Sequence, residues 1–456
     1  MRAASPMAVN LRDRKYALDI DPKALDGQDV VVAGWIQETR DMGGIAFVIL
    51  RDRSGTLQVV LPKKKLDAAL VESLTKPNRE SVVAILGTVK ASEKARNGYE
   101  VLPKEVRMLN ESAAPLPMGI VDKVDVDFET RLDNRFLDLR KPEVQAIFRV
   151  RSALVKAGID SFTRQGFFQV HTPRIIGASS EGGTDLFPVK YFEKDAFLAQ
   201  SPQLYKQMLM ATGLDRQFEV ATYFRAEKHN SYRHLNEVTA FDVEMAFVES
   251  EEDVMKILET AVRDMWQGVH DHCHAELKLL NKEVKVPQLP FARLTYDEAL
   301  KLVNGAGRWT NEKGEQAQIP WGDDLNAAAE KILGEVMAER GHAFYFITKY
   351  PETVRPFYTY VDEDGTTTRS FDLEHAGLEV TSGAQRQHDP QKLVQRIEAK
   401  GLNPADFRDY LKPFQYGMPP HGGFGLGIDR LTMEVLNLPN VREAVLFPRD
   451  RTRLAP

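Results

Sequence analysis

The residues with the clearest capacity for chemistry lie at positions 224–245, in the segment FRAEKHNSYRHLNEVTAFDVEM. Its two arginines, Arg225 and Arg233, offer planar guanidinium groups that match the oxygens of a phosphate group. The ring of Phe241 can stack on a purine, and Glu227 can accept a hydrogen bond from the exocyclic amine of the base. Because strand-like alternation flanks the segment, it predicts a hairpin that binds ATP. A solvated hairpin with surface ion pairs would carry the same charges.

A second segment, GFGLGIDR at residues 423–430, brings three glycines to the start of a predicted helix. Glycine lets the backbone approach a ligand closely, and Arg430 adds its charge to the positive end of the helix. The pattern predicts contact with bound phosphate. Glycines that serve only the packing of a strand against a helix would give the same pattern, so the motif is weak by itself.

Three further segments are EVTSGAQR (379–386), SSEGGTDLF (179–187) and QSPQLYKQ (200–207). Glu379 and Ser382 offer oxygen ligands at a spacing that could reach a Mg²⁺ ion shared with phosphate. Lys206 and Arg386 are cations in segments of mixed character, as a second carboxylate on a substrate would require. Each of these residues could instead be a solvated surface charge.

A fourth group, His270, His272, Cys273 and His274, has the residue types of a zinc site. We expect no zinc there, because the segment has the pattern of a helix end with polar faces and no other ligand type converges on it.

Length and composition bound these possibilities. The chain has 456 residues, 43 % of them hydrophobic, which allows two or three domains. Its single cysteine rules out an internal disulfide, and no apolar run reaches the roughly 20 residues that cross a bilayer. We therefore expect a soluble protein of a reducing cytoplasm with no membrane partner. The net charge of −6 argues against indiscriminate binding to nucleic acid but allows a local basic face.

The elements that must position these residues fall into two parts. Residues 28–109 have the pattern of five short strands with turn signals between them, which favours a small closed barrel of the OB type over another small β-sandwich. The stretch 114–142 has three prolines and few apolar runs, which indicates a hinge. We predict a barrel domain at 1–113, this hinge, and a catalytic domain at 143–456.

The catalytic part is predicted to be α+β. A helix begins near Pro142, carries apolar residues at helical spacing from Val144 to Phe162, and ends at Gly166. A strand cut short by Pro173 follows it. Later segments alternate between helices and strands whose pattern favours an antiparallel sheet with flanking helices over a doubly wound parallel sheet.

In combination, these segments resemble the three signature motifs of the class II aminoacyl-tRNA synthetases. GFFQVHTPRI (166–175) resembles motif 1, residues 224–245 resemble motif 2, and residues 423–430 resemble motif 3. The segments SSEGGTDLF, QSPQLYKQ and SGAQR, together with the barrel, narrow the resemblance to the aspartyl-tRNA synthetases, in the compact form found in archaea. The resemblance covers nearly the whole chain. It implies an N-terminal OB-fold anticodon-binding barrel and a class II catalytic domain that forms a homodimer, with the stripe from Val144 to Phe162 and the Pro173 turn partly buried across a two-fold axis.

The resemblance also implies roles for single residues. For ATP it implies Arg225, Ala226, Glu227, Arg233, His234, Leu235, Phe241, Glu379, Gly427, Ile428, Asp429 and Arg430, with Arg225, Glu379 and Arg430 as the catalytic residues. For L-aspartate it implies Glu181, Gln203, Lys206, Arg225, Asp242, Ser382, Arg386 and His421. For Mg²⁺ it implies Glu379 and Ser382. Within the aspartate set, Asp242 would lie near the ammonium group, and Lys206 and Arg386 on the side-chain carboxylate.

In the barrel, the resemblance implies that Gln37, Arg40, Phe47, Gln58, Arg96 and Glu100 contact the tRNA anticodon. Family members that accept only tRNA(Asp) tend to have Trp and Lys at two positions that fall on or beside Gln37 and Arg96. The amide at Gln37 departs from this pattern, whereas Arg96 keeps a cation. A flexible amide excludes the wrong base less well than a bulky ring, so we expect charging of tRNA(Asn) in addition to tRNA(Asp).

Three alternatives remain. An aspartate–ammonia ligase of the same catalytic fold would need no barrel. An asparaginyl-tRNA synthetase would bind a neutral amide, for which the two cations Lys206 and Arg386 have no use. An inactive RNA-binding relative would not need the motif arginines and Glu379, all of which are present.

Overall fold

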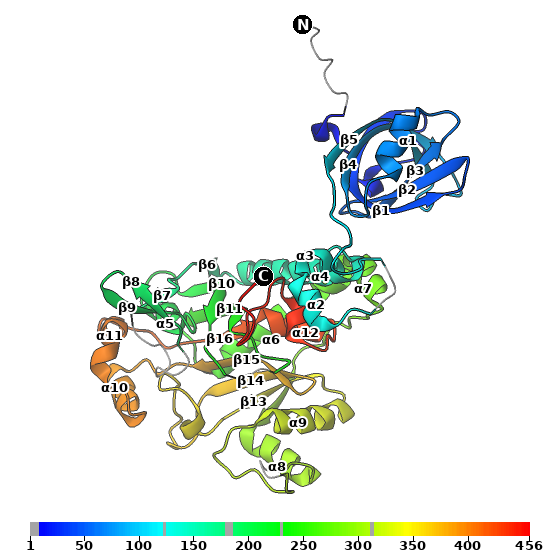
Figure 1. The fold of residues 1–456 in the computed structure, drawn as a ribbon. Helices are drawn as coiled ribbons and strands as arrows, with labels where there is room; N and C mark the ends of the chain where they lie inside the picture. Colours follow the sequence, from blue (N-terminus) through cyan, green and yellow to red (C-terminus); the bar gives the residue numbers. More distant parts are fainter. Residues whose placement is uncertain (1–8, 122–124, 178–185, 229–230, 311–313) are drawn as a thin grey trace. The chain divides into compact units, whose positions relative to one another are not determined.

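The computed structural model describes residues 9–121, 125–177, 186–228, 231–310 and 314–456. The chain forms two compact units, Met1–Asp127 and Phe128–Pro456. Figure 1 labels their helices and strands and colours the chain along the sequence. No helix in the described ranges is both long and apolar enough to span a membrane. Each unit is described by itself below.

The first unit is a closed five-stranded barrel with strand order β1-β2-β3-β5-β4. Its strands are β1 (Asp29–Asp41), β2 (Ile45–Arg51), β3 (Thr56–Pro62), β4 (Val82–Ala91) and β5 (Tyr99–Asn110). Helix α1 (Ala68–Thr75) lies between β3 and β4, and the short helices η1 (Leu11–Asp13) and η2 (Ala17–Asp19) precede β1. Alternate strand residues such as Val32, Val48, Val59 and Ile85 fill the interior. The barrel prediction is confirmed, and the alternative of an open β-sandwich is wrong.

The boundary between the units differs from the expected hinge at 114–142. Helices α2 (Phe128–Asp133) and α3 (Arg135–Asp138) form within that stretch and belong to the second unit. The cause is Arg135, which is fully buried and donates to the Asp138 carboxylate at 2.7 Å and to the Leu446 carbonyl at 3.0 Å. A buried guanidinium needs such acceptors, so it holds the segment to the catalytic unit.

The second unit is built on an eight-stranded sheet with strand order β12-β13-β14-β15-β16-β11-β10-β6. The strands are β6 (Phe168–Gln169), β10 (Arg216–Phe224), β11 (Glu237–Ala246), β12 (Ala292–Thr295), β13 (Phe344–Thr348), β14 (Ser370–His375), β15 (Leu378–Gln385) and β16 (His421–Gly427). Neighbouring strands are antiparallel except in the two outermost pairs, β12 with β13 and β6 with β10. A separate three-stranded sheet, in the order β7-β9-β8, has strands β7 (Ile175–Ile176), β8 (Pro188–Tyr191) and β9 (Lys194–Leu198).

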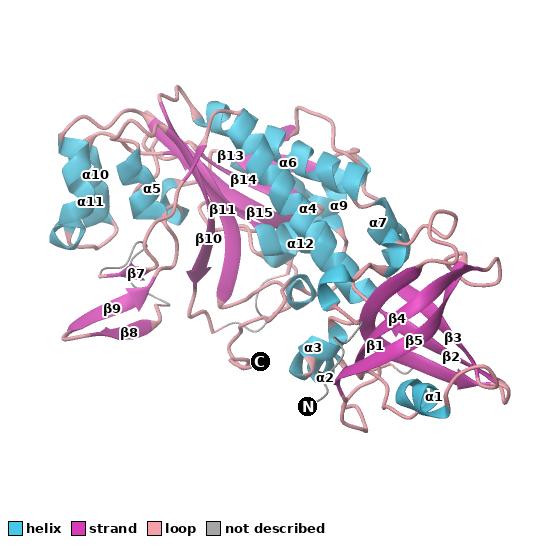
Figure 2. Ribbon diagram, turned by 90° about the horizontal axis from the view of Figure 1, so that it is seen from above, coloured by secondary structure: helices cyan, strands magenta, loops and turns pink. Residues whose placement is uncertain are grey.

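Helices cover one face of the large sheet and part of the other. Helices α4 (Pro142–Arg164), α6 (Glu251–His272) and α12 (Ile428–Val435) lie across one face, as Figure 2 shows. Helices α8 (Tyr296–Ala306) and α9 (Ala327–Glu339) pack on the opposite face near β12 to β15. The remaining helices are α5 (Gln203–Leu209), α7 (His274–Leu280), α10 (Pro390–Ala399) and α11 (Arg408–Gln415), with short turns η3 (Glu352–Val354), η4 (Pro404–Phe407) and η5 (Val441–Ala444).

Strand alternation divides the apolar residues between the two faces. Phe344 and Phe346 join the core under α4 and α6, whereas Tyr345 and Ile347 join the cluster under α8 and α9. The rest of the second face, between the helix pair α8–α9 and the hairpin of β10 and β11, is left for polar side chains.

The apolar stripe of α4 packs inside its own chain. Val144, Ile147, Val150 and Leu154 are buried, and the last three join the core cluster with α6 and the sheet. Val155 and Ile159 of the same stripe are only partly buried, so burial of the stripe across a two-fold axis stays a prediction. The apolar side of this 23-residue amphipathic helix packs on the nearest apolar surface, which is the sheet of the same chain.

The segment of three histidines and Cys273 lies where α6 meets α7. Cys273 is buried in the core, and burial raises the pKa of its thiol to about 11. The His270 ring contacts the Asp271 carboxylate through Nδ1 at 2.8 Å. In the ranges that the structure describes, no group of three or more His, Cys, Asp or Glu side chains is arranged to hold a metal ion.

Close packing of α4 on α6 and the sheet depends on Gly158. A Cβ atom there would lie 2.6 Å from Met265 Cε and 2.7 Å from Phe241 Cζ. We expect Gly158→Ala to lower the free energy of unfolding by about 1–2 kcal/mol, because overpacking outweighs the gain in helix propensity. Urea unfolding followed by circular dichroism measures the change.

The matched control is Gly305→Ala. Gly305 is exposed on α8, and a Cβ there would meet no atom within 4 Å. This change should raise the free energy of unfolding by about 0.5–1 kcal/mol through helix propensity alone. Equal effects of the two substitutions would contradict the packing described.

Candidate active site

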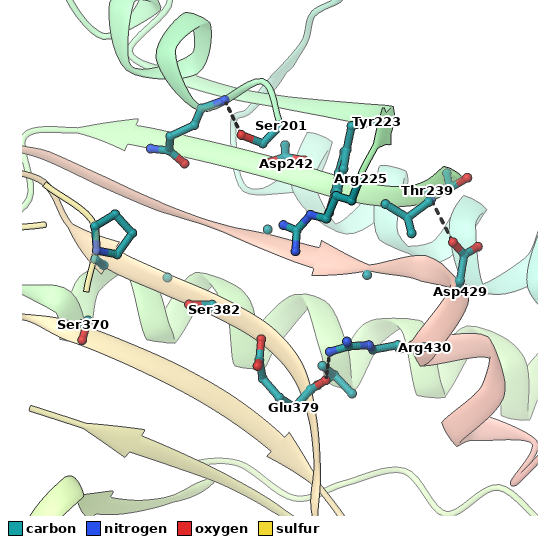
Figure 3. A pocket seen from close by; sticks show the side chains of 18 of the residues that line it. Ser201, Tyr223, Arg225, Thr239, Asp242, Ser370, Glu379, Ser382, Asp429 and Arg430 are labelled. Atoms are coloured by element: carbon teal, nitrogen blue, oxygen red, sulfur yellow. Dashed lines mark hydrogen bonds between the residues drawn. The ribbon is translucent and has the colours of Figure 1, made fainter. Parts of the chain in front are cut away.

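A cavity of about 410 Å³ lies on the sheet face opposite α4 and α6. Its walls come from the hairpin of β10 and β11, from α5, β15, β16 and α12, and from the loop at 354–359. Figure 3 shows Arg225, Glu379 and Arg430 directed into it from three different elements. The three segments that could bind a nucleotide therefore meet at one place, although they are separated by up to about half of the chain.

The hairpin of β10 and β11 is closed by Asn236. Its side chain donates to the carbonyls of Arg225 at 2.6 Å and Glu227 at 3.1 Å, and its own carbonyl accepts the Arg225 backbone N–H at 2.9 Å. These bonds hold Arg225 and Glu227 at the cavity, where their side chains form an ion pair at 3.7 Å. The predicted pairing of a phosphate-binding arginine with an adenine-binding glutamate is compatible with this position.

Arg233 and His234 line the cavity from the far end of the same turn. Arg233 Nη1 donates to the Glu330 carboxylate on α9 at 2.6 Å, and His234 Nδ1 lies 2.6 Å from the Ser231 hydroxyl. Glu330 therefore holds Arg233 toward the cavity from outside the hairpin.

The glycines of β16 make room for carboxylates on β11. A Cβ atom at Gly423 would lie 2.2 Å from Glu244 Oε2, and one at Gly425 would lie 3.5 Å from Asp242 Oδ1. Packing is thus a real function of these glycines, as the alternative interpretation of the motif required. The cavity is lined by Gly425 and Gly427.

Two residues at the start of α12 have different surroundings. Arg430 lines the cavity, and its Nη1 donates to the Glu379 carbonyl at 2.8 Å. The buried Asp429 carboxylate accepts the Thr239 N–H at 2.8 Å and pairs with Arg151 of α4 at 2.6 Å. Asp429 therefore joins α4, β11 and α12.

Four buried charges form the inner end of the cavity. Lys206 Nζ lies 3.2 Å from Asp242 Oδ1 and 3.5 Å from Glu244 Oε2. Arg386 donates to the two Glu244 oxygens at 2.9 and 3.2 Å. Burial alone would raise the pKa of Glu244, but Arg386 and Lys206 together lower it. Each cation is compensated before any substrate binds.

Two atoms at this end have no hydrogen-bond partner among the described residues. They are Asp242 Oδ2, a buried acceptor, and Gln203 Nε2, a buried donor. Burial raises the pKa of Asp242 in spite of the nearby Lys206. A substrate that carries an ammonium group and a carboxylate would supply what these atoms lack, because buried polar groups are almost always hydrogen-bonded.

Glu379 and Ser382 lie on β15 beside two residues that sequence reasoning missed. Asp372 is the register partner of Ser382 on β14, and its Oδ1 has no hydrogen-bond partner within the described ranges. Arg355 lines the cavity, pairs with Asp372 at 2.5 Å and donates to the Ser382 hydroxyl at 3.4 Å. The sequence Phe-Asp-Leu in β14 places a carboxylate in an apolar strand, which could have indicated Asp372. Its proximity to Ser382 follows only from the pairing of β14 with β15.

The surroundings of Glu379 suit a divalent cation. Part of its side chain is accessible from the cavity although protein surrounds it, and burial, together with the neighbouring Asp372 carboxylate, raises its pKa to about 7. Carboxylate and hydroxyl oxygens are the ligands that Mg²⁺ prefers, and a cation would relieve the repulsion between the carboxylates. The residues present therefore fit the predicted ion.

Phe241 and Ile428 do not reach the cavity, contrary to expectation. The Phe241 ring is fully buried against Phe162 and Phe218 on the helix-covered face. It alternates with Asp242, so only one of the two can face the cavity. The stacking role assigned to Phe241 is therefore wrong, and Val238 and Thr239 line the cavity in its place. Ile428 packs into the same core.

The other predicted residues divide into four groups. Gln203, Lys206, Leu235, Asp242, Ser382, Arg386 and Asp429 line the cavity, together with the residues described above. His421 is fully buried behind it, with Nε2 3.3 Å from Gln207 Oε1, and burial lowers its pKa to about 4. Glu181 lies outside the described residues. Ala226 lines a second cavity.

This second cavity, of about 630 Å³, shares Glu227 with the first. Apolar side chains of Phe187, Leu198 and Phe224 line it together with Lys228, Arg449, Arg451 and Arg453. Aromatic rings beside cations are the features that bind unpaired nucleotides.

In the barrel, the predicted anticodon residues lie on β1, β2, β3 and β5 and in one loop. Gln37 is the extra residue of a bulge in β1, and Arg40 is the register partner of Phe47. Gln58 donates to Glu100 at 2.7 Å across the pair of β3 and β5. Arg96 is exposed in the loop between β4 and β5. A bulge changes the direction of the side chain at the extra residue, so the direction of Gln37 cannot be predicted from the alternation of the strand.

Comparison with known proteins follows the same division. The family model described as tRNA synthetases class II (D, K and N) matches residues 127–451, and the model described as OB-fold nucleic acid binding domain matches residues 30–109. The chain is 51 % identical over 434 residues to the aspartate–tRNA(Asp) ligase of Thermococcus kodakarensis, covering 95 % of this chain and 97 % of the relative. It is 49 % identical over 441 residues to the aspartate–tRNA(Asp/Asn) ligase of Methanopyrus kandleri, covering 97 % and 99 %.

A solved structure agrees with these matches. The asparaginyl-tRNA synthetase of Pyrococcus horikoshii, in complex with asparaginyl-adenylate, superposes with a TM-score of 0.89 at 33 % identity, covering 97 % of this chain and 99 % of that one. The barrel, the antiparallel sheet and the meeting of the three motifs at one cavity agree with these matches, and the chain belongs to the archaeal-type aspartyl-tRNA synthetases of class II.

Proposed function

We propose that this chain activates L-aspartate with ATP and transfers the aspartyl group to the terminal ribose of tRNA. The observation that carries the proposal is the buried set of Lys206, Arg386, Asp242 and Glu244 at the inner end of a cavity whose outer part has three arginines, Arg225, Arg233 and Arg430. One end suits a small amino acid with a charged side chain, and the other suits a triphosphate.

Selection of aspartate over asparagine depends on charge. Lys206 and Arg386 can both donate charge-assisted hydrogen bonds to a side-chain carboxylate, whereas a neutral amide accepts weaker bonds and brings its own N–H donors against the two cations. Asp242, whose Oδ2 lacks a partner among the described residues, would hold the ammonium group. The likeness to an asparaginyl-tRNA synthetase makes that enzyme the runner-up, and the two cations favour aspartate.

The chemistry is positioning and charge neutralisation. The α-carboxylate of aspartate attacks the α-phosphorus in line, Arg225 neutralises charge on that phosphate, and Arg233 and Arg430 hold the outer phosphates as pyrophosphate leaves. Glu379, Ser382 and Asp372 would hold Mg²⁺, which supplies further stabilisation of phosphate charge when bound. The protein needs no nucleophile of its own, because the carboxylate of the substrate attacks.

Transfer to tRNA uses both units. The second cavity, beside Glu227, would seat the unpaired end of the tRNA, and the barrel would bind the anticodon through Phe47, Gln58 and Glu100. An aspartate–ammonia ligase would have no use for the barrel. The single buried cysteine is compatible with the reducing cytoplasm in which we place the enzyme.

Arg386 provides the test of amino acid recognition. Replacing Arg386 with leucine should lower kcat/KM for aspartate by about 10²–10³ in ATP–pyrophosphate exchange, since an unpaired carboxylate in a desolvated site costs on the order of 3–5 kcal/mol. The control is Arg408→Leu, whose side chain is 86 % exposed, and which should leave exchange unchanged. A loss smaller than tenfold in a folded Arg386 variant would show that another residue binds the side chain.

The range of tRNAs charged depends on the bulge at Gln37. We expect aspartylation of tRNA(Asp) and tRNA(Asn) transcripts with kcat/KM values within about 30-fold of each other, because an amide and a cation provide only about 1–2 kcal/mol of discrimination. Gln37→Trp should raise the preference for tRNA(Asp), while Lys64→Ala, on the turn after β3, should not. A preference above a thousandfold in the unaltered enzyme would reject relaxed specificity.

Assembly into a homodimer is expected from the exposed apolar residues of the catalytic unit. Phe168 on edge strand β6 and Ile175 on β7 are 55 % and 51 % exposed, and such residues mark protein interfaces. Light scattering at micromolar concentration should give about twice the 51.5 kDa of one chain, and Phe168→Asp should lower the mass. A monomer mass for the unaltered protein would reject the dimer.

A further inference from the structure

The turn that joins β10 to β11 carries Arg225, Glu227, Arg233 and His234, yet its described residues form few bonds among themselves. Apart from the Asn236 contacts and the Arg225–Glu227 ion pair, the hydrogen bonds described within it join Ser231 to its neighbours Arg233 and His234. Arg225, Arg233 and Arg430 all line one cavity, where Arg225 pairs with Glu227 and Arg233 with Glu330. A turn of this kind needs support from outside to keep a binding geometry.

The C-terminal segment, residues 440–453, supplies four hydrogen bonds to this turn. Arg442 Nη1 donates to the Ser231 carbonyl at 3.0 Å, and the Val441 N–H donates to the Tyr232 carbonyl at 2.8 Å. Arg451 donates to the Lys228 carbonyl at 2.9 Å, and the Arg449 carbonyl accepts the Asn236 N–H at 2.9 Å. Both ends of the turn and its middle are therefore bonded to one segment.

The C-terminal segment is itself fixed to the first helices of the catalytic unit. Arg131 of α2 pairs with Glu443 at 3.0 Å, and Arg135 donates to the Val445 carbonyl at 3.0 Å. Arg151 of α4 donates to the Ala444 carbonyl at 3.2 Å. Farther along, Arg453 pairs with Glu129 at 2.6 Å and Asp133 at 2.7 Å. The support is rigid because charged, mostly enclosed groups hold it at several points.

Arg442 is the central residue of this support. It is buried, its Nε donates to Asp450 at 2.6 Å, and its N–H is capped by Asn440 at 3.0 Å. The Arg442 guanidinium therefore lies between two partners. The Asp450 carboxylate orients it, and the Ser231 carbonyl of the turn accepts its hydrogen bond. Val441, the preceding residue, lines the cavity.

We infer that the C-terminal segment sets the conformation of the nucleotide-binding turn, and that Arg442 is a positioning residue for ATP. It acts through the Ser231 carbonyl on the orientation of Arg233 and His234, and it touches no substrate. The inference rests on the proposed function, because its main readout is the affinity for ATP.

The experiment measures KM for ATP and KM for aspartate separately in ATP–pyrophosphate exchange. Arg442→Met should raise KM for ATP at least tenfold while KM for aspartate changes less than threefold, because the four charges at the inner end of the cavity are not bonded to the turn. Asp450→Asn keeps the volume and an oxygen that can accept from Thr452 and Arg453, but it weakens the pair with Arg442, so it should raise KM for ATP by a smaller factor. Arg408→Ala is the exposed control and should change neither constant.

Hydrogen exchange of the peptide that spans residues 225–236 gives a readout independent of activity. It should become faster in Arg442→Met and Asp450→Asn than in the unaltered enzyme and the control. If Arg442→Met does not fold, Asp450→Asn decides the outcome by the same two measurements. Unchanged KM for ATP and unchanged exchange in a folded variant would overturn the inference. Absence of exchange activity in the unaltered enzyme would instead reject the proposed function.

Discussion

The ion pairs among Lys206, Arg386, Asp242 and Glu244 are the constraint on which the rest of the catalytic unit depends. Four charges removed from water are tolerated only when each has a partner at hydrogen-bond distance. Neighbouring elements are shaped by that requirement: β16 has glycine opposite each carboxylate, and α5 carries Lys206 to them from outside the sheet. Because Arg386 has more N–H donors than the two that bond Glu244, the same group can also hold a zwitterion whose side chain ends in a carboxylate.

The sheet separates this polar face from the apolar one by alternation along β11. Asp242 lines the cavity and Glu244 lies on the same face of β11, whereas Phe241 and Val243 face α4 and α6. Asp429 then ties the two faces together, because its carboxylate bonds Arg151 of α4 and the Thr239 N–H of β11. The arginines that line the cavity suit the phosphates of a triphosphate, and the neighbouring carboxylates of Glu379 and Asp372 suit a divalent cation bound with it.

Much of this arrangement follows from the sequence. The barrel, the antiparallel sheet and the meeting of Arg225, Glu379 and Arg430 could be predicted from strand patterns and motif residues. The predictions that failed required the strand register or the hydrogen-bond partners that lie far away in the chain. Phe241 has the right chemistry for stacking on a base. However, Asp242 lies on the cavity side of β11, so the Phe241 ring points into the core on the opposite side. The hinge prediction failed because the acceptors of Arg135 lie more than 300 residues away in the chain. Asp372 could be recognised as a candidate site residue only from the pairing of β14 with β15, which places it beside Ser382.

The central claim, that buried charge balance selects aspartate, is tested most directly by ATP–pyrophosphate exchange with aspartate and asparagine in parallel, without tRNA. The account predicts that kcat/KM for aspartate exceeds that for asparagine by more than about a thousandfold, since an amide cannot form the charge-assisted hydrogen bonds with Lys206 and Arg386 that a carboxylate forms. Values within tenfold of each other, or a preference for asparagine, would contradict it.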